Sequence, residues 1–568
     1  MTDEAKPVLI PEPPAADVGG SPRAAWFAVA LCLVFFMQGL VFIPYAGIQT
    51  DEALFGMGIY KPIYAEHMAW VFGHDVPTMI TSYIGALKTW IYAVIFQVWP
   101  PSPFSVRVPV LLAGTLTVWL FFLLLRDTAG IRAALAGCAL LAFDTVFLLT
   151  TTFDWGPVAF QHLLLVSGML LVTRFYKWGG LINLGAGFFL LGLGLWDKAL
   201  FVWMLGGLGV ATLTVFPREL FSKLSRRNAG VASICFLAGA WPLVAYNSIS
   251  GLETFRANAQ YSSAELHAKV DQVRLNLEGG ALLGYLVQDD PAPRPGRPES
   301  ALERGSVALS DWSDAPRAGL LGIALVLSLA LLPWLWSSPA RKPMLFALVF
   351  LVVTWLQMAF TQDVGGSAHH VILLWPFPQV VVAVAFTRAT RALGRAAVTV
   401  LAVLIAAVCG SSLLVTNQHL AQLVVRGPTT VWTDAVYPLA EYLAQLPVKR
   451  IYVMDWGVID SLRLLGRGQL PLWVDSEEAA KEKMDENDLE IVDEMLAAEE
   501  AVFLGHTEGN EELKGRSARF AAAAESAGYR KQVLRVIEDA RGRPIFEVYR
   551  WVGAGSKPAA ASGPAQSS

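Results

Sequence analysis

Residues 24–43 read AAWFAVALCLVFFMQGLVFI, an apolar run without a charged side chain. A helix of about 20 residues spans about 30 Å, which is the thickness of the hydrocarbon core of a bilayer. A signal peptide would have a shorter apolar core and a small-residue cleavage site, so we expect a retained membrane span. Residues 1–22 are rich in Pro and Ala and predict a disordered cytoplasmic tail.

The composition of the whole chain also indicates a membrane protein. Its 568 residues are 55% hydrophobic and 16% charged, whereas a soluble chain carries about 25% charge. These values exclude a plain cytosolic enzyme and disfavour a disordered chain. The net charge of −4 gives no basic surface for nucleic acid. All four cysteines (Cys32, Cys138, Cys235 and Cys409) lie in apolar runs and predict small buried side chains, not a disulfide framework.

Ten further apolar runs predict a polytopic α-helical membrane protein with eleven spans. They lie at about 107–125, 133–152, 158–174, 180–196, 199–216, 229–247, 318–337, 343–361, 371–387 and 396–416. One more candidate, Tyr83–Trp99, is shorter and carries Lys88. If this segment does not cross, the later basic loops fall on the same side as Arg23, as the positive-inside rule requires. We therefore expect Tyr83–Trp99 to be an interfacial helix, with Lys88 at the level of the headgroups.

This topology predicts a cytoplasmic amino terminus and a transmembrane domain at 23–420. Its large outer regions are residues 45–106 and 248–317. Residues 430–552 alternate helical and strand patterns, which predicts an outer α/β domain with a partly parallel sheet. Residues 553–568 are rich in Gly, Ala, Ser and Pro and predict a second disordered tail.

The acidic candidates for a site stand at the outer ends of spans. Asp51 and Glu52 follow the first span, and Asp154 follows the third. Thr50 or Asp51 could simply cap the next helix, and Asp154 could do the same before Pro157. Alternatively, two carboxylates facing one aqueous layer could act together on a hydroxyl group.

Basic side chains are expected in the same layer. Lys88, Lys198, His369 and His370 all fall outside, where they could bind a phosphate or simply snorkel to the interface. His162 and Asp144 lie within spans, and each could be functional or form a hydrogen bond between helices.

An ordered set of motifs in residues 45–160 carries a family resemblance. It comprises Thr50-Asp51-Glu52, then Leu87-Lys88-Thr89-Trp90-Ile91-Tyr92, then Phe104-Ser-Val-Arg107, and Asp154 after the third span. With these motifs the chain resembles the polyprenyl-phosphate-sugar-dependent glycosyltransferases of the GT-C fold. It is most similar to bacterial relatives of the protein O-mannosyltransferases and of the lipid A aminoarabinose transferase.

The resemblance implies inverting transfer of a sugar from a polyprenyl phosphate to an acceptor hydroxyl, in the inner (plasma) membrane with the α/β domain in the periplasm. Asp51 would be the general base and Asp154 the second acid of the site. Lys88 would contact the lipid phosphate, as would His369 or His370, while Glu52, Lys198 and His162 are further candidates for binding substrate. The acceptor could be a glycan, a lipid or a protein.

The resemblance implies no metal and no other cofactor here. In the aminoarabinose transferase an acidic residue precedes the lysine and helps to bind a metal, but this chain has Leu87, so His267 would lack that partner.

Two other classes of protein remain alternatives. A lipid or solute transporter would typically show internal repeats and polar sites near the bilayer midplane. A receptor would use the α/β domain as its sensor, although eleven spans exceed what an anchor needs. The sequence names neither the sugar nor the acceptor.

Overall fold

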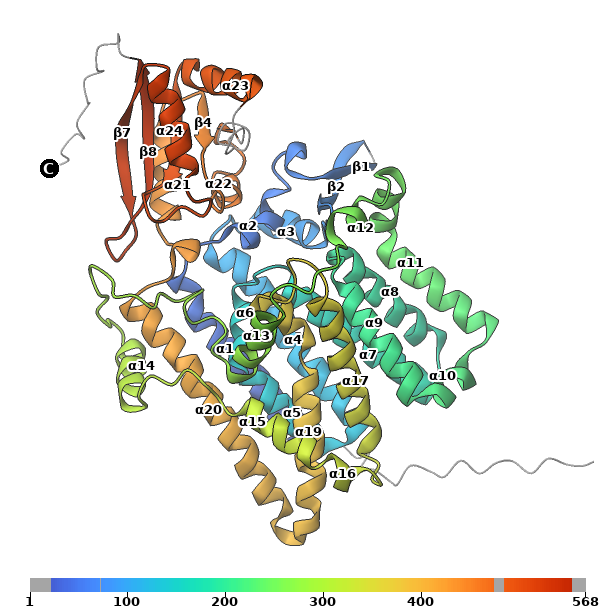
Figure 1. The fold of residues 1–568 in the computed structure, drawn as a ribbon. Coiled ribbons are helices and arrows are strands. Elements are labelled where there is room, and N and C mark those ends of the chain that lie inside the picture. Colours follow the sequence, from blue (N-terminus) through green and yellow to red (C-terminus); the bar gives the residue numbers. More distant parts are fainter. Residues whose placement is uncertain (1–21, 72, 474–484, 554–568) are drawn as a thin grey trace, which may run out of the picture.

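A computed structural model describes residues 22–71, 73–473 and 485–553 of the chain. The predicted tails lie outside these residues, except for Pro22 and Gly553, which belong to a helix and a strand. The molecule consists of a helical bundle with a sheet-containing domain at one end (Figure 1).

A helix or a broken pair of helices lies in each of the eleven predicted spans. These are α1 (Pro22–Phe42), α4 (Pro103–Ala129), α5 (Ile131–Ala142) with α6 (Thr145–Thr152), α7 (Val158–Trp178), α8 (Leu181–Asp197), α9 (Phe201–Val215), α11 (Arg226–Ile249), α15 (Leu321–Ala330) with α16 (Leu332–Leu335), α17 (Arg341–Ala359), α19 (Phe377–Thr390) and α20 (Ala397–Val425).

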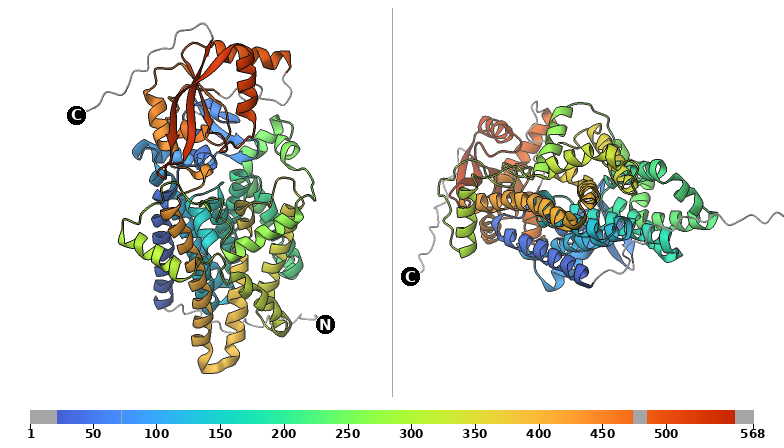
Figure 2. Two further views of the ribbon diagram at one scale, coloured as in Figure 1. Left: turned by 60° about the vertical axis from the view of Figure 1, so that its left-hand side comes forward. Right: turned by 90° about the horizontal axis from the view of Figure 1, so that it is seen from below.

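Fewer than eleven of these helices are long and apolar enough, by themselves, to cross a membrane. Within the described residues six stretches qualify, or up to eight if the bent pairs α5–α6 and α9–α10 (Pro217–Lys223) each form one span. One stretch, Phe377–Val425, contains both α19 and α20. The two helices are separated at Gly394, where the backbone leaves the helical conformation. The chain reverses there, so that α19 and α20 lie side by side (Figures 1 and 2). The protein is a multi-pass membrane protein, and the count of eleven stays a prediction.

The first outer region contains a small sheet that the sequence analysis missed. Its strands β1 (His67–Val71), β2 (His74–Thr81) and β3 (Ile84–Gly85) pair antiparallel in that order. The interfacial helix expected from Tyr83 therefore begins later, as α3 (Leu87–Val98). Before the sheet lie η1 (Ile43–Tyr45), α2 (Thr50–Met57) and η2 (Pro62–Tyr64).

Short helices make up most of the remaining connections. They are α12 (Glu253–Asn258), α13 (Leu266–Glu278), α14 (Ala301–Trp312), α18 (Ala368–Val371), η3 (Ile372–Leu374), η4 (Arg391–Ala396) and η5 (Thr430–Trp432).

The carboxyl-terminal domain has a five-stranded sheet of order β5-β4-β6-β8-β7. Its strands are β4 (Arg450–Val453), β5 (Leu472–Trp473), β6 (Ala501–His506), β7 (Tyr529–Glu538) and β8 (Pro544–Gly553). Strand β4 is parallel to β5 and β6, and β8 is antiparallel to β6 and β7, which confirms a partly parallel sheet.

Helices cover both faces of this sheet, because successive apolar side chains of its central strands point alternately to one face and to the other. Ile451 and Val453 pack with α21 (Val436–Gln445) and α22 (Ile459–Leu465). Tyr452 and Met454 pack on the other face with α23 (Glu486–Ala497) and α24 (Arg516–Ser526). This alternation gives the small domain two apolar cores of its own.

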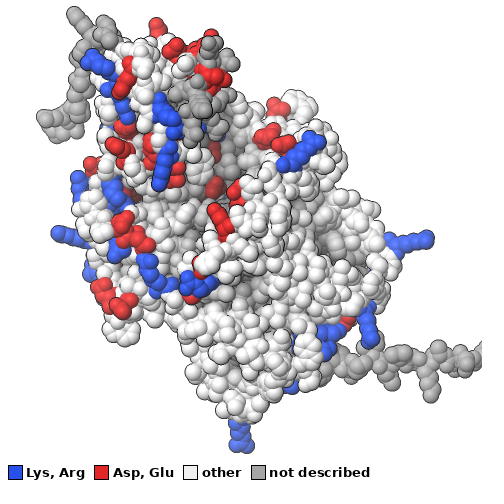
Figure 3. All heavy atoms as spheres, viewed as in Figure 1, with Lys and Arg blue, Asp and Glu red and all other residues white. Residues whose placement is uncertain are grey.

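Charge on the surface follows this division. Charged side chains gather over the carboxyl-terminal domain and the adjoining loops, while most of the visible bundle surface is uncharged (Figure 3). At the opposite tip of the bundle, η4 carries the exposed Arg391 and Arg395. The bundle thus presents an apolar belt between two charged ends, as a bilayer requires.

Candidate functional site

Arg107 of α4 fixes the loop that leads from α1 into α2. Its guanidinium donates hydrogen bonds to the carbonyl oxygens of Ile43 (2.6 Å), Ala46 (2.9 Å) and Gly47 (2.7 Å). It also donates to both carboxylate oxygens of Glu52, at 2.7 and 2.8 Å. Both side chains are buried. The role of Glu52 in binding substrate stays a prediction, and in this structure its carboxylate is bound by Arg107.

Asp51 extends from the first turn of α2 toward Trp155. The cap of α2 is Gln49, whose side chain accepts from the Asp51 N–H at 2.7 Å, so neither Thr50 nor Asp51 is the capping residue. One carboxylate oxygen of Asp51 accepts from the Trp155 indole N–H at 2.9 Å. The Gln49 side chain interacts with the same carboxyl group and, like Trp155, lowers its pKa.

The surroundings of Asp51 make it a stronger base than an ordinary aspartate. Burial raises the pKa of its carboxyl group, against the opposing effects of the Lys198 charge and the Trp155 hydrogen bond. A higher pKa brings a carboxylate closer to the range in which a general base is effective at neutral pH.

Asp154 and Lys88 form an ion pair sealed from solvent. Asp154 (φ 42°) and Gly156 (φ 74°) take left-handed conformations in the turn between α6 and α7. One Asp154 oxygen accepts from the Ala159 N–H at 3.1 Å, which caps α7, and the other binds Lys88. Both side chains are 1% exposed. Lys88 therefore does not reach the headgroup level, and that prediction is corrected.

Lys198 approaches the same turn from the end of α8. Its carbonyl oxygen accepts from Gln161 at 3.2 Å, and its backbone pairs with Ile84 of β3. A Cβ atom on Gly156 would lie 3.1 Å from the Lys198 ammonium. Among the described residues, Lys198 forms no ion pair. Burial lowers its pKa to about 8, although Asp51, Asp197 and Asp154 oppose this change.

Asp197 belongs to the same charged group and was missed as a site residue. It is fully buried, and neither of its carboxylate oxygens has a hydrogen-bond partner in the described chain. The signal was the adjacent pair Asp197-Lys198 at the end of an apolar run.

His369 and His370 join the site through aromatic contacts. The His369 ring lies 4.2 Å from Trp155 and 4.0 Å from His370, between ring centres. Burial lowers the pKa of both rings, to about 3 for His370, with Lys198 adding to the effect. The pair is therefore neutral at physiological pH and contributes hydrogen-bond donors and acceptors, not the positive charge of an ionic contact with a phosphate.

Trp155 connects the histidines to Asp51, and the sequence analysis missed it. Its ring stacks on Tyr285 at 4.0 Å while its N–H binds Asp51. The only signal was its place directly after Asp154.

Two intramembrane candidates have structural contacts. The His162 ring lies 2.8 Å from the Val158 carbonyl and 2.9 Å from that of Ile372, within a buried helix contact. Its role in binding substrate stays a prediction. Asp144 caps α6 and accepts from Trp375 at 2.8 Å and Gln379 at 2.9 Å, so it joins the broken helix α5–α6 to α19.

A cavity of about 250 Å³ opens beside the two histidines. Its lining is largely polar: Tyr83, Leu200, Ala257, Asn258, Gln260, Gln362, Asp363, Val364, His369 and His370. Within the described residues no three His, Cys, Asp or Glu side chains could hold a metal ion. His267 lies exposed beside Asp271.

The carboxyl-terminal domain rests directly on the loop before Asp51. The Gly47 N–H donates to the Trp432 carbonyl at 2.8 Å, and a Cβ on Gly47 would lie 1.9 Å from the Thr433 oxygen. From α22, Ser461 donates to the Ile48 carbonyl at 2.8 Å. The site therefore lies between the bundle and this domain.

The chain has the GT-C fold, because its structure is similar to solved structures of that fold over most of its length. The structure of ArnT, an aminoarabinose transferase, from Cupriavidus metallidurans bound to undecaprenyl phosphate is similar over 95% of this chain and 99% of its own, with a TM-score of 0.54 and 12% identity. The apo oligosaccharyltransferase of Archaeoglobus fulgidus matches 94% of this chain and 74% of its own, with a TM-score of 0.52 and 12% identity. No family model and no curated protein matches the sequence.

Proposed function

We propose that the protein is a membrane glycosyltransferase that moves a sugar from a polyprenyl phosphate to an acceptor hydroxyl. The observation that carries this proposal is that Asp51 and Lys198 interact electrostatically at the end of a membrane bundle, while neither forms an ion pair within the described residues. The fold supports the proposal, because ArnT with this fold has been solved with undecaprenyl phosphate.

In this mechanism Asp51 is the general base. It removes the proton of the acceptor hydroxyl as the oxygen attacks the anomeric carbon of the sugar. The bond from that carbon to the phosphate oxygen breaks, and the polyprenyl phosphate leaves with the electron pair. Attack opposite the leaving group inverts the anomeric configuration.

Lys198 is the main phosphate ligand in this proposal. A leaving phosphate gains charge in the transition state, so a preorganised cation there stabilises it. Lys88 is paired with Asp154. It supports the phosphate either from a distance or directly, after exchanging Asp154 for the phosphate. His369 and His370 would donate neutral hydrogen bonds.

The reaction would take place on the outer face of the inner (plasma) membrane. Arg391 and Arg395 mark the opposite end of the bundle, which the positive-inside rule assigns to the cytoplasm together with the amino terminus. The carboxyl-terminal domain would then be periplasmic.

The test uses the purified protein in nanodiscs with radiolabelled polyprenyl-phosphate sugars and cell-envelope glycans. We expect transfer by the wild type, and a loss of about 100-fold or more in Asp51→Asn, the scale of a lost general base. Asp460→Asn is the matched control, since Asp460 is a buried acid close to Asp51 that is already paired with Arg463. Equal turnover in Asp51→Asn and wild type would contradict the assignment.

A further inference from the structure

A crevice in the carboxyl-terminal domain lies where its parallel strands diverge. From β4 the chain passes through α22 to β5 on one side, then returns through α23 to β6 on the other side. Helices α22 and α23 lie on opposite faces of the sheet. In open α/β sheets such a reversal of strand order leaves a crevice at the carboxyl ends of the two strands, and ligands bind there.

The side chains at this reversal are polar, and their positions are fixed. Asp455 follows β4 and accepts from the ring of His506, the last residue of β6, at 2.7 Å. Its oxygens also accept from the backbone N–H groups of Trp456 (2.8 Å), Glu512 (3.0 Å) and Leu513 (3.0 Å). Asp455 thus links the loop that follows β4 to the loop that follows β6.

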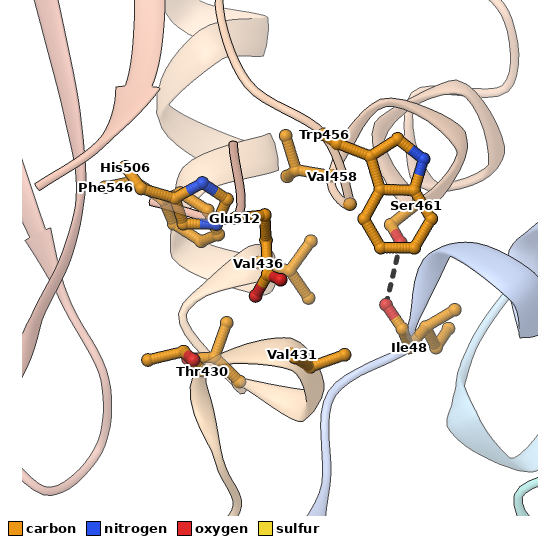
Figure 4. Close-up of a pocket in the computed structure, with 12 residues that line it drawn as sticks. Ile48, Thr430, Val431, Val436, Trp456, Val458, Ser461, His506, Glu512 and Phe546 are labelled. Atoms are coloured by element: carbon orange, nitrogen blue, oxygen red, sulfur yellow. Dashed lines mark hydrogen bonds between the residues drawn. The ribbon is translucent and has the colours of Figure 1, made fainter. Parts of the chain in front are cut away.

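Three of the groups around the crevice remain available to a ligand. Trp456 is 48% exposed, unusual for so large an apolar side chain. The Glu512 carboxylate projects into the space between Trp456, His506 and Thr430 (Figure 4). The second ring nitrogen of His506 has no hydrogen-bond partner among the described residues.

The opposite wall of the crevice is the loop that leads to Asp51. Ile48 lines the crevice three residues before Asp51, and Ser461 binds its carbonyl oxygen (Figure 4). Glu512 and Asp51 both act electrostatically on Tyr285, whose pKa they raise in addition to the effect of burial. The crevice therefore adjoins the proposed base and is not a remote surface feature.

We propose that this crevice is an acceptor subsite that holds a sugar unit of a hydroxyl-rich glycan next to Asp51. This assignment rests on the proposed glycosyl transfer. The C–H face of a sugar ring packs on an exposed indole, and its hydroxyls donate to a carboxylate and an imidazole. The enclosed space is only about 10 Å³, enough for one water, so the sugar lies across the mouth on Trp456.

The charge of the crevice defines the class of sugar. Glu512 presents a carboxylate, and the crevice-lining residues that the structure describes include no lysine or arginine. A neutral or amino-bearing sugar unit suits this surface, whereas a polyanionic unit is repelled.

The test is saturation-transfer NMR on the full-length protein in nanodiscs, with cellotetraose as a neutral probe and tetragalacturonate as an anionic one. We expect cellotetraose to bind the wild type. In Trp456→Ala its saturation-transfer signal should fall about fivefold, which corresponds to the loss of one aromatic contact. Trp473→Ala is the matched control, because Trp473 is 44% exposed on the same domain but lies outside the crevice. Trp456→Phe keeps a ring and should retain most of the signal.

Further outcomes separate the subsite from the proposed function. Tetragalacturonate should bind weakly to wild type and better to Glu512→Gln. No cellotetraose signal with wild type, or equal losses in Trp456→Ala and Trp473→Ala, would overturn the subsite. Binding of undecaprenyl phosphate to the same samples tests the proposed function on its own, since that binding depends on Lys198.

Discussion

Asp51 and Asp154 each follow a membrane helix, but their carboxylates differ in what remains free. Both oxygens of Asp154 are engaged, by Lys88 and by the Ala159 N–H. Asp51 interacts with the side chains of Trp155 and Gln49 but forms no ion pair among the described residues. Asp51 can therefore accept a proton without breaking an ion pair, while Asp154 serves to hold Lys88 in place.

The hydrogen bond from Trp155 should tune the basicity of Asp51. This bond lowers the pKa of the Asp51 carboxyl, so Trp155→Phe should raise it. The acidic limb of the pH profile of kcat/KM would then move to higher pH, by about 0.5–1 pH unit for a hydrogen bond of about 1 kcal/mol. The measurement is the pH profile of both proteins.

Trp432→Phe is the control for this substitution. Trp432 is a buried neighbour of Tyr285, and its indole N–H has no hydrogen-bond partner in the described chain. The same loss of ring volume at Trp432 should leave the acidic limb in place. Equal shifts in both variants would show that packing, not the hydrogen bond, governs Asp51.

The charge of Lys198 should control binding of the lipid phosphate. Its pKa of about 8 means that the ammonium is charged at pH 7 and loses its charge as the pH rises through 8. Affinity for undecaprenyl phosphate should therefore fall above pH 8 in the wild type. In Lys198→Arg the affinity should stay level to pH 9, because a guanidinium keeps its proton.

Lys198→Met supplies the second arm of this experiment. We expect affinity at pH 7 to fall about 10- to 100-fold, the range for a charge-assisted hydrogen bond. The dependence on pH above 8 should vanish at the same time. A fall that persists in Lys198→Met would assign the titration to a different group.

At the scale of elements, the loop between α1 and α2 depends on a single side chain from α4. Arg107→Met would leave Glu52 buried without its cation and three carbonyl groups without their donor. We expect a loss of about 3–5 kcal/mol in stability, as for other broken buried ion pairs. Thermal unfolding in nanodiscs measures it. Arg126→Met is the control, because Arg126 is 38% exposed beside Asp127 and should cost at most about 1 kcal/mol.

The sequence predicted best those elements whose residues show a strong hydrophobic periodicity or a strongly biased composition. The apolar runs located every bundle helix, and thereby placed Asp51 and Asp154 at helix ends. The strand patterns expected within residues 430–552 are confirmed by β4, β6, β7 and β8. Strands β1 to β3 were not, because Pro77 and a short, irregular pairing obscure their alternation.

Contacts between distant residues could not be predicted. Lys88 and Asp154 are 66 residues apart, and Glu52 and Arg107 are 55 apart. Nothing local distinguishes a lysine that pairs with an acid from one that meets a phosphate. For the same reason Lys198 was one candidate among several, and Trp155 was not recognised.

At the scale of the molecule, the site lies where the bundle meets the carboxyl-terminal domain. The loop at Gly47 is pinned to Trp432, and α22 packs on α2. The two parts therefore form one site, and the crevice at Trp456 lies on the side of the carboxyl-terminal domain. The charged end of the bundle that carries η4 lies far from this junction (Figures 1 and 3).

This arrangement predicts that the two ends of the bundle face opposite sides of the membrane. In a variant without native cysteines, Asp363→Cys beside the site and Arg391→Cys in η4 are both exposed positions. A membrane-impermeant maleimide added to intact cells should label Asp363→Cys, and Arg391→Cys only after the membrane is opened. Lys449→Cys in the carboxyl-terminal domain should behave like Asp363→Cys, because the domain covers the site. Labelling of Asp363→Cys and Arg391→Cys from the same side would refute the topology. The side of the membrane on which the proposed reaction occurs would then be unassigned.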